Sequence, residues 1–235
     1  MKSFQIIPLV LLAIILQSCA GFNCLEGTGP VITEEIDLNL IKEIENNTSV
    51  DIELRYGQNQ KIEVKGHRNH IELLQRQVSA ERWVVDFSEN VCAEDMIIKV
   101  TIPEIRSLEI DGSGDFTALT PFQGKDFDVM IDGSGNVSID ISAEDIDIDV
   151  DGSGDVRLNG YAEEMTVNID GSGDVFAFDL EANEVSVDSD GSGNVQIYVK
   201  ETLNAKIKGS GNITYKGDPE KMEFTQKGSG SIKQK

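Results

Sequence analysis

Acidic side chains recur at regular intervals in the second half of the chain, within a short glycine-rich motif. The motif Asp-Gly-Ser-Gly-Asp/Asn begins at five aspartates, and its fifth position adds three more: Asp111, Asp132, Asp151, Asp170 and Asp190, then Asp115, Asp155 and Asp174. If successive copies stack, they form two acidic columns, in which charges ~5 Å apart repel by on the order of 1 kcal/mol in water. Carboxylates and carbonyls are the ligands that Ca²⁺ prefers, so these eight residues are candidate calcium ligands. Alternatively, each Asp accepts hydrogen bonds from backbone N–H groups of its own turn.

The residue types that a hydrolase needs are present, but not in a catalytic pattern. A serine nucleophile requires a Gly-x-Ser-x-Gly elbow and a histidine base, whereas Gly-Ser-Gly is copied seven times and the only histidines are His67 and His70. The spacing of these two histidines suits a metal, but no acid or cysteine is fixed beside them, which favours a solvated loop. The pairs Glu144/Asp145 and Glu163/Glu164 resemble glycosidase carboxylates, yet such pairs recur from unit to unit. We therefore predict a non-catalytic protein, with a polysaccharide-acting enzyme on a β-helix as the alternative.

The motif is part of a longer repeat that predicts the fold. Two degenerate copies start at Lys208 and Lys227, and the seven starts are 18 to 21 residues apart. Apolar residues alternate with polar ones on both sides of each copy, as in strands that are buried on one face. Each unit then reads as strand, Gly-Ser-Gly turn, strand and polar corner, and we expect the glycines to supply a positive φ at the turn. We predict an all-β, parallel β-solenoid of about 19-residue repeats, in preference to an antiparallel meander or barrel.

The region before the repeats reads as the same kind of structure. Alternating segments predict strands near 50–54, 62–64, 83–87 and 98–102, and one short helix is expected near residues 69–76. We divide the chain into a signal peptide (1–18), an anchor-proximal linker (19–30) and a continuous solenoid (31–235). The solenoid has an irregular part at 31–105 and regular repeats at 106–235.

The beginning of the chain predicts its compartment. A basic residue, an apolar run and Leu16-Gln17-Ser18-Cys19 resemble a lipoprotein signal in which Cys19 is acylated. An ordinary signal peptide or a retained membrane helix are the alternatives. Ala20 favours the outer membrane, with the periplasmic or surface face left open. In this oxidising compartment Cys24 and Cys92 are expected to form a disulfide rather than remain free thiols.

The charge distribution limits the partners. Residues 111–200 carry three basic and 21 acidic groups, whereas residues 201–235 carry seven basic and four acidic groups. The acidic block disfavours nucleic acid and anionic membranes, so membrane attachment is expected through the lipid alone. The block is either a solvated face or a divalent-cation surface. The late lysines are expected to cap the last units and to discourage end-to-end stacking.

Three segments resemble a known family, the head GIN domain of autotransporter adhesins found among Bacteroidetes-type envelope lipoproteins. They are the strand near Ile41–Ile44, Val64-Lys-Gly-His-Arg-Asn69 before the helix, and Ile98–Pro103 leading into Leu108–Gly114. The resemblance covers roughly residues 31–215. It implies a β-helical fold at the cell envelope and an adhesive or structural role toward a protein or glycan, and it brings no catalytic residues or cofactor. The uniform Asp-Gly-Ser-Gly array departs from the family pattern.

Overall fold

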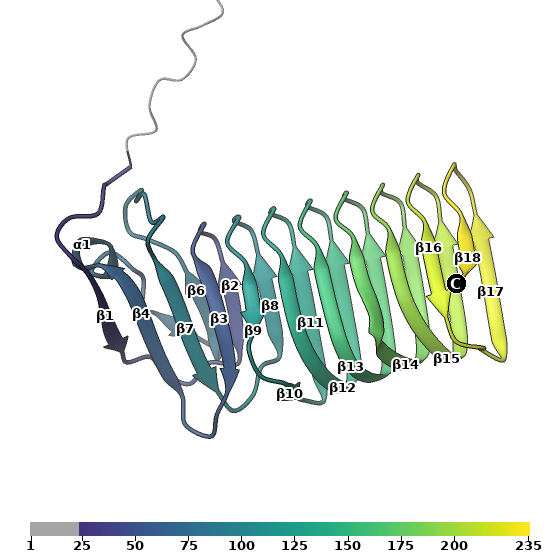
Figure 1. Cartoon of the computed structure of the whole chain (residues 1–235), viewed down its shortest axis with the longest axis horizontal. Helices are drawn as coiled ribbons and strands as arrows, with labels where there is room; N and C mark the ends of the chain where they lie inside the picture. Colours follow the sequence, from purple (N-terminus) through teal and green to yellow (C-terminus); the bar gives the residue numbers. More distant parts are fainter. Residues whose placement is uncertain (1–23) are drawn as a thin grey trace, which may run out of the picture.

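The computed structural model describes residues 24–235 and is built almost entirely of β-strands (Figure 1). The predicted signal peptide (residues 1–18) and the predicted lipidation site, Cys19, lie outside the described residues. The strands are β1 Val31–Ile36, β2 Glu43–Asn46, β3 Asp51–Tyr56, β4 Lys61–His67, β5 Val78–Ser79, β6 Arg82–Val85, β7 Ile97–Ile102, β8 Ser107–Ile110, β9 Phe116–Ala118, β10 Phe122–Gln123, β11 Asp126–Ile131, β12 Val137–Val150, β13 Val156–Ile169, β14 Val175–Ser189, β15 Val195–Ile207, β16 Ile213–Lys216, β17 Lys221–Gln226 and β18 Ile232–Gln234. The helix α1 spans Arg68–Ile71. No described helix has the length and apolar character needed to cross a membrane.

The repeats form the predicted parallel β-solenoid. Neighbouring coils pair in register at the 19-residue spacing, so that Val137 lies over Val156 and Ile148 over Val167. Alternate side chains point between the two sheets and are buried, while the others face outward. The apolar columns therefore form one elongated core, and the Gly-Ser-Gly turns lie in a row along one edge (Figure 1).

The turn glycines are needed for close stacking of the coils, which corrects the expected reason for their presence. Among the motif glycines only Gly228 has a positive φ. Instead, a Cβ atom at Gly152 would lie 2.1 Å from the carbonyl oxygen of Gly133 in the preceding coil, and Gly171 meets Gly152 in the same way. The glycines are therefore required by contact between backbones of successive coils.

The expected polar corners are bends within long strands. β12 runs without interruption from Val137 to Val150, and its alternation of buried and outward-facing residues changes phase at residues 144–145, where the strand bends from one sheet into the other. Ala143 points inward at the bend and is buried, above Ala162 of the next coil. Each central coil therefore has one sharp glycine turn and one gradual bend.

The N-terminal coils follow an order in space that differs from their order in sequence. β2 pairs with β6 on one side and β8 on the other, and β3 likewise lies between β7 and β9. The first coil of the chain is therefore inserted between its second and third coils. This interleaving fixes residues 31–105 to the regular repeats.

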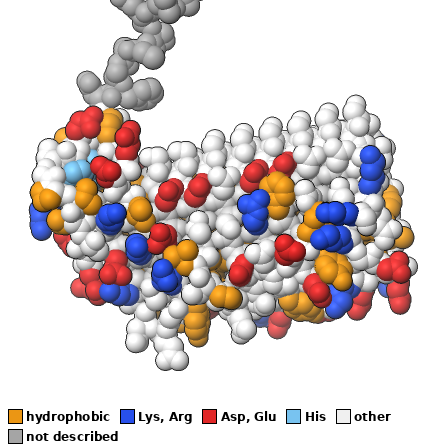
Figure 2. Space-filling model, viewed as in Figure 1, with side chains coloured by type: hydrophobic (Ala, Val, Ile, Leu, Met, Phe, Trp, Pro, Cys, Tyr) orange, Lys and Arg blue, Asp and Glu red, His pale blue; other side chains and the backbone are white. Residues whose placement is uncertain are grey.

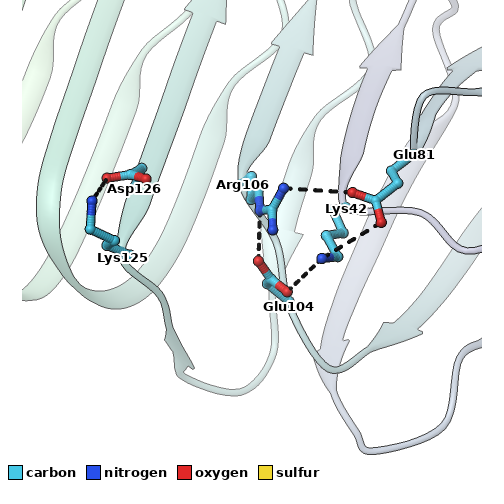
Figure 3. A network of polar contacts seen from close by, with 6 residues as sticks. All are labelled: Lys42, Glu81, Glu104, Arg106, Lys125 and Asp126. Carbon is cyan, nitrogen blue, oxygen red and sulfur yellow. Dashed lines mark hydrogen bonds and ion pairs between the residues drawn. The ribbon is translucent and has the colours of Figure 1, made fainter.

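An ion-pair network joins these interleaved coils (Figure 3). Glu104 contacts Lys42 at 3.1 Å and Arg106 at 2.6 Å, and both bases also contact Glu81, at 3.6 and 3.5 Å. Partial burial opposes ionisation of Glu104, but hydrogen bonds from Lys42 and Arg106 outweigh it and lower the pKa of the carboxyl group. The network links the segments that lead into β2, β6 and β8.

Antiparallel strands close the N-terminal end of the solenoid. β4 pairs antiparallel with β7, and β1 adds to β4 as the outermost strand. The helix is shorter than expected: it ends at Ile71, and residues 72–76 are not helical. Leu74 forms a bridge with Phe87, and the Gln75 N–H donates to Asp86 O. Pairing with this neighbouring segment competes with helical hydrogen bonds beyond Ile71.

The C-terminal end of the solenoid is uncovered in the described chain. β17 pairs only with β15, and β18 only with β16. Met222 and Phe224 continue inward-facing columns, but 54% and 45% of their surfaces are exposed. The lysine of the sixth motif copy, Lys208, lies 2.5 Å from Asp190 of the preceding coil. It therefore neutralises the last aspartate of the first acidic column.

Candidate functional site

The structure places the predicted ligands of the first acidic column on the turn edge, one above another. Two aspartates of this column have raised pKa values. Desolvation and the nearby acids Glu45 and Asp132 raise the pKa of Asp111. Desolvation and repulsion by Asp132 and Asp170 raise the pKa of Asp151. A cation would relieve this repulsion. Among the described residues, however, Asp111 is the only predicted ligand within a group of three acids whose oxygens lie within 4.8 Å. Its partners there, Glu45 and Glu109, already pair with Arg82.

The fifth-position residues form a hydrogen-bonded ladder from coil to coil. The Asn136 N–H donates to Asp115 Oδ1 at 2.8 Å, and the Asp155 N–H donates to Asn136 Oδ1 at 2.9 Å. The same contact continues through Asp174 and Asn194, at 2.9 and 2.6 Å. Each side chain thus accepts a backbone N–H of the next coil rather than one of its own turn. This role requires an Oδ atom, which Asp and Asn both supply, and no metal.

We expect Asp174→Ala to lower the free energy of unfolding by about 1–3 kcal/mol, because it leaves the Asn194 N–H without its acceptor. Asp174→Asn retains an Oδ acceptor and should remain close to the native stability. Ser172→Ala, at an exposed serine of the same turn whose side chain makes no described hydrogen bond, is the control. Urea unfolding followed by circular dichroism measures all three. Equal stability of the Asp174→Ala and Ser172→Ala variants would contradict the ladder.

The two remaining cysteines and the two histidines meet at the N-terminal end of the solenoid. Cys24 and Cys92 form a disulfide with Cα atoms 5.3 Å apart. The adjacent Leu25 carbonyl oxygen lies 2.8 Å from His70 Nε2, and His67 Nε2 lies 3.6 Å from Asp95. The segment from Cys24 is thus attached to the body, and the buried His70 helps to hold it.

The candidate catalytic carboxylates lie at the bends. The hydroxyl of Tyr161 donates to Glu163 Oε2 at 2.7 Å, and Asn183 Nδ2 donates to the same oxygen at 2.9 Å. These two hydrogen bonds lower the pKa of Glu163. A glycosidase acid needs a raised pKa, so the environment of Glu163 is the opposite of the one that such catalysis requires.

The outer face of the sheet that follows the turns carries side chains that sequence reasoning missed. Phe176 and Phe178 of β14 point outward and are half-buried, whereas the single tryptophan, Trp83, is fully buried. Arg157 lies 4.8 Å from the Phe176 ring centroid. Hydrophobic and basic side chains lie next to one another over the C-terminal half of this face (Figure 2). The signal was available in the sequence, because Val175 and Ala177 occupy inward columns and the alternate residues must face outward.

A β-bulge explains the position of Phe178. The pairing of β14 with β13 shifts register between Arg157 and Asn159, and the pairing of β14 with β15 shifts after Ala177. The interval between the motifs at Asp170 and Asp190 is 20 residues instead of 19, which supplies the additional residue. Bulges redirect side chains next to functional sites. Here the ring of Phe178 lies beneath Lys216 Nζ at 4.3 Å and Lys235 Nζ at 4.6 Å.

These features define a two-sheet parallel β-solenoid with an antiparallel N-terminal cap and long, flat outer faces. The family model described as "Putative auto-transporter adhesin, head GIN domain" matches residues 41–219, so the chain belongs to the head GIN domain family.

Solved structures agree with this assignment. A "putative adhesin" from Bacteroides fragilis has 26% identity and a TM-score of 0.86, and the alignment covers 90% of this chain and 100% of the other. Another "putative adhesin", from Parabacteroides distasonis, has 22% identity and a TM-score of 0.74 over 91% and 100% of the two chains. A "putative lipid binding protein" from the same species has 24% identity and a TM-score of 0.70 over 90% and 99%. The last two show the fold alone. No curated protein matches the chain.

Proposed function

We propose that this protein is a non-catalytic binding module of the cell envelope, anchored in the outer membrane by a lipid on Cys19. The observation that carries the proposal is the outer face, on which hydrogen-bonded coils hold outward side chains in register. Membership of the adhesin family supports a role in attachment. The ligand would meet side chains that are already ordered, which reduces the entropy lost on binding.

The site chemistry favours binding over turnover. The carboxylates proposed for a glycosidase occupy exposed bends, and Glu163 is held in its ionised form by Tyr161 and Asn183. Two hollows of the described surface are bounded by the turn ladder, one lined by Asp115, Asn136 and Asp155 and the other by Asp174, Asn194 and Asn212. Those ladder residues already hold neighbouring coils together. We interpret the exposed bends and the hollows beside the ladder as parts of a binding face.

The anchor is tested by replacing the cysteine that would carry the lipid. We expect Cys19→Ser to move the protein from the membrane fraction to the soluble fraction and to abolish metabolic labelling with a radioactive fatty acid. Cys24→Ser, five residues further along the chain, is the matched control and should remain labelled and membrane-bound. Labelling that persists in the Cys19→Ser variant would place the lipid elsewhere and contradict this part of the proposal.

The binding role is tested in the same strains. A deletion strain complemented with the wild-type gene should recover attachment to host or bacterial extracellular matrix, and complementation with Cys19→Ser should not restore it. Protease treatment of intact cells should remove the wild-type protein while a periplasmic marker stays intact. Resistance to protease, together with unchanged attachment of the deletion strain, would overturn the adhesive function.

A further inference from the structure

The outer face of β13 to β18 contains a row of side chains that runs along the solenoid axis. One residue of each successive coil occupies the same register position, in the order Arg157, Phe176, Gln196, Thr214 and Lys233. We call these five residues the axial strip. At a strand spacing of ~4.8 Å, its two cations are about 19 Å apart. The strip therefore presents a cation, an aromatic ring, an amide, a hydroxyl and a second cation to one extended ligand.

Four bases of this face have no carboxylate partner within the described residues, whereas Lys200 pairs with Glu181. In the described chain, no ion pair involves Arg157, Lys216, Lys233 or Lys235, although the protein has 42 acidic and 20 basic residues. Elsewhere bases do pair with acids, as Lys206 does with Asp188. Three of the unpaired bases lie over phenylalanine rings instead. Four cations of this face are thus without an ion-pair partner among residues 24–235, beside a ladder that carries Asp115, Asp155 and Asp174.

The energies of these contacts favour exchange with an anionic ligand. A cation over an aromatic ring is held weakly at an exposed site, whereas a hydrogen bond between two oppositely charged groups is stronger. A carboxylate or sulfate can therefore draw Arg157 or Lys216 away from its ring. The exchange also uncovers the faces of Phe176 and Phe178 for stacking.

Hollows at both ends of the axial strip match an extended polymer. One hollow of about 300 Å³ is lined by Arg157, Thr117 and Ser138 together with the ladder residues Asp115, Asn136 and Asp155. Another, of about 340 Å³, is lined by Gln196, Thr214 and Lys233 together with the ladder residues Asp174, Asn194 and Asn212. Amide and hydroxyl groups at these positions suit the hydroxyls of a sugar ring. β13 and β14 are paired on both edges, so a peptide cannot add there as a further strand.

We infer that the axial strip, with the adjacent group Phe178, Lys216 and Lys235, binds an anionic polysaccharide that lies along the solenoid axis. The pyranose rings stack on Phe176 and Phe178, and the acidic groups contact Arg157 and Lys233. The inference rests on the proposed binding function and names the ligand class for that function.

The test is affinity electrophoresis of the full chain in native gels that contain polygalacturonate, with neutral dextran gels for comparison. We expect polygalacturonate, but not dextran, to retard the protein, and we expect this retardation to decrease as salt is added. The double variant R157Q/K233Q should weaken apparent binding about tenfold, and F176S should weaken it several-fold without a change of charge. The matched control is K206Q/K208Q, which removes the same charge from two lysines that are paired with Asp188 and Asp190. Thermal melts by circular dichroism verify that the variants are folded.

Three results would overturn the inference. They are an absence of retardation by polygalacturonate, an equal loss of binding in K206Q/K208Q, or equally tight binding of poly-glutamate or anionic phospholipid vesicles through the same residues. If polygalacturonate does not retard the purified protein but cell attachment still depends on the protein, this inference fails and the proposed function stands.

Discussion

Replacing Gly152 with alanine is expected to unfold the solenoid or to leave it more than about 4 kcal/mol less stable, a loss that few single substitutions cause. The new Cβ atom would lie 2.1 Å from the Gly133 carbonyl oxygen and 2.7 Å from that of Asp132. Both contacts are with backbone atoms of the adjacent coil, so no side chain can move aside. The coils must separate, and the hydrogen bonds and apolar contacts between them are lost together. Soluble yield and urea unfolding measure the effect.

Two further glycines make this prediction falsifiable even if the Gly152 variant does not fold. A Cβ atom at Gly124 would meet no atom closer than 3.8 Å, so Gly124→Ala should be nearly neutral. Gly230→Ala produces a 1.9 Å contact with Gly211 O, but in the last coil, and should detach only β17 and β18. In a stack in which each coil contacts only its neighbours, the loss of stability depends on which coil carries the substitution. Similar stability of all three variants would disprove the stacking explanation.

Reduction of the Cys24–Cys92 disulfide is expected to destabilise the N-terminal coils by about 2–4 kcal/mol, because it removes a crosslink between two residues that are 68 positions apart in the sequence. Leu25 also makes two backbone hydrogen bonds to this segment. Its N–H donates to the Asn90 carbonyl oxygen at 2.8 Å, and its carbonyl oxygen accepts the Cys92 N–H at 3.0 Å. These contacts should loosen once the covalent link is lost. The single tryptophan, Trp83, is buried in β6, so its fluorescence reports on this end of the molecule.

The measurement compares two signals during urea unfolding, with and without reductant. The fluorescence transition should move to lower urea on reduction, while the circular dichroism of the whole solenoid should move less. A Cys24→Ala/Cys92→Ala variant should match the reduced wild type and should not respond to reductant. Titration of the denatured, unreduced protein should find neither Cys24 nor Cys92 as a free thiol. An unchanged fluorescence midpoint on reduction would contradict the predicted crosslink.

The repeats could be predicted from the sequence because one physical requirement recurs at each coil. The alternation of Val137, Ile139 and Ile141 defines the inward face, and the interval between motifs gives the register. The same alternation also determines which aromatic residues face outward, so Phe176 and Phe178 could have been found.

Other features depend on contacts that a single sequence does not contain. Glycine is compatible both with a positive φ and with close backbone contact, and only the position of Gly133 O relative to Gly152 distinguishes the two. The insertion of β2 and β3 between later coils has no glycine motif to reveal it. There the buried Asn46 closes the turn by donating from Nδ2 to the Val50 carbonyl oxygen at 2.9 Å. This turn, residues 47–51, keeps the serine and the fifth-position aspartate of the motif, and Asp51 Oδ1 accepts the Asp115 N–H at 3.0 Å. It lacks both glycines, so repetition of Gly-Ser-Gly does not reveal it.

The pairing of β12 with β13 has an implication for how this protein can change over generations. A central coil presents the same backbone pattern to the coil before it and to the coil after it, so an in-frame tandem duplication of one unit preserves both junctions. Such a duplication would lengthen the solenoid by ~4.8 Å. An insertion of any other size must form a bulge, as the single additional residue of β14 does. The distance between the two ends of the solenoid can thus be altered in small, equal increments by ordinary replication errors.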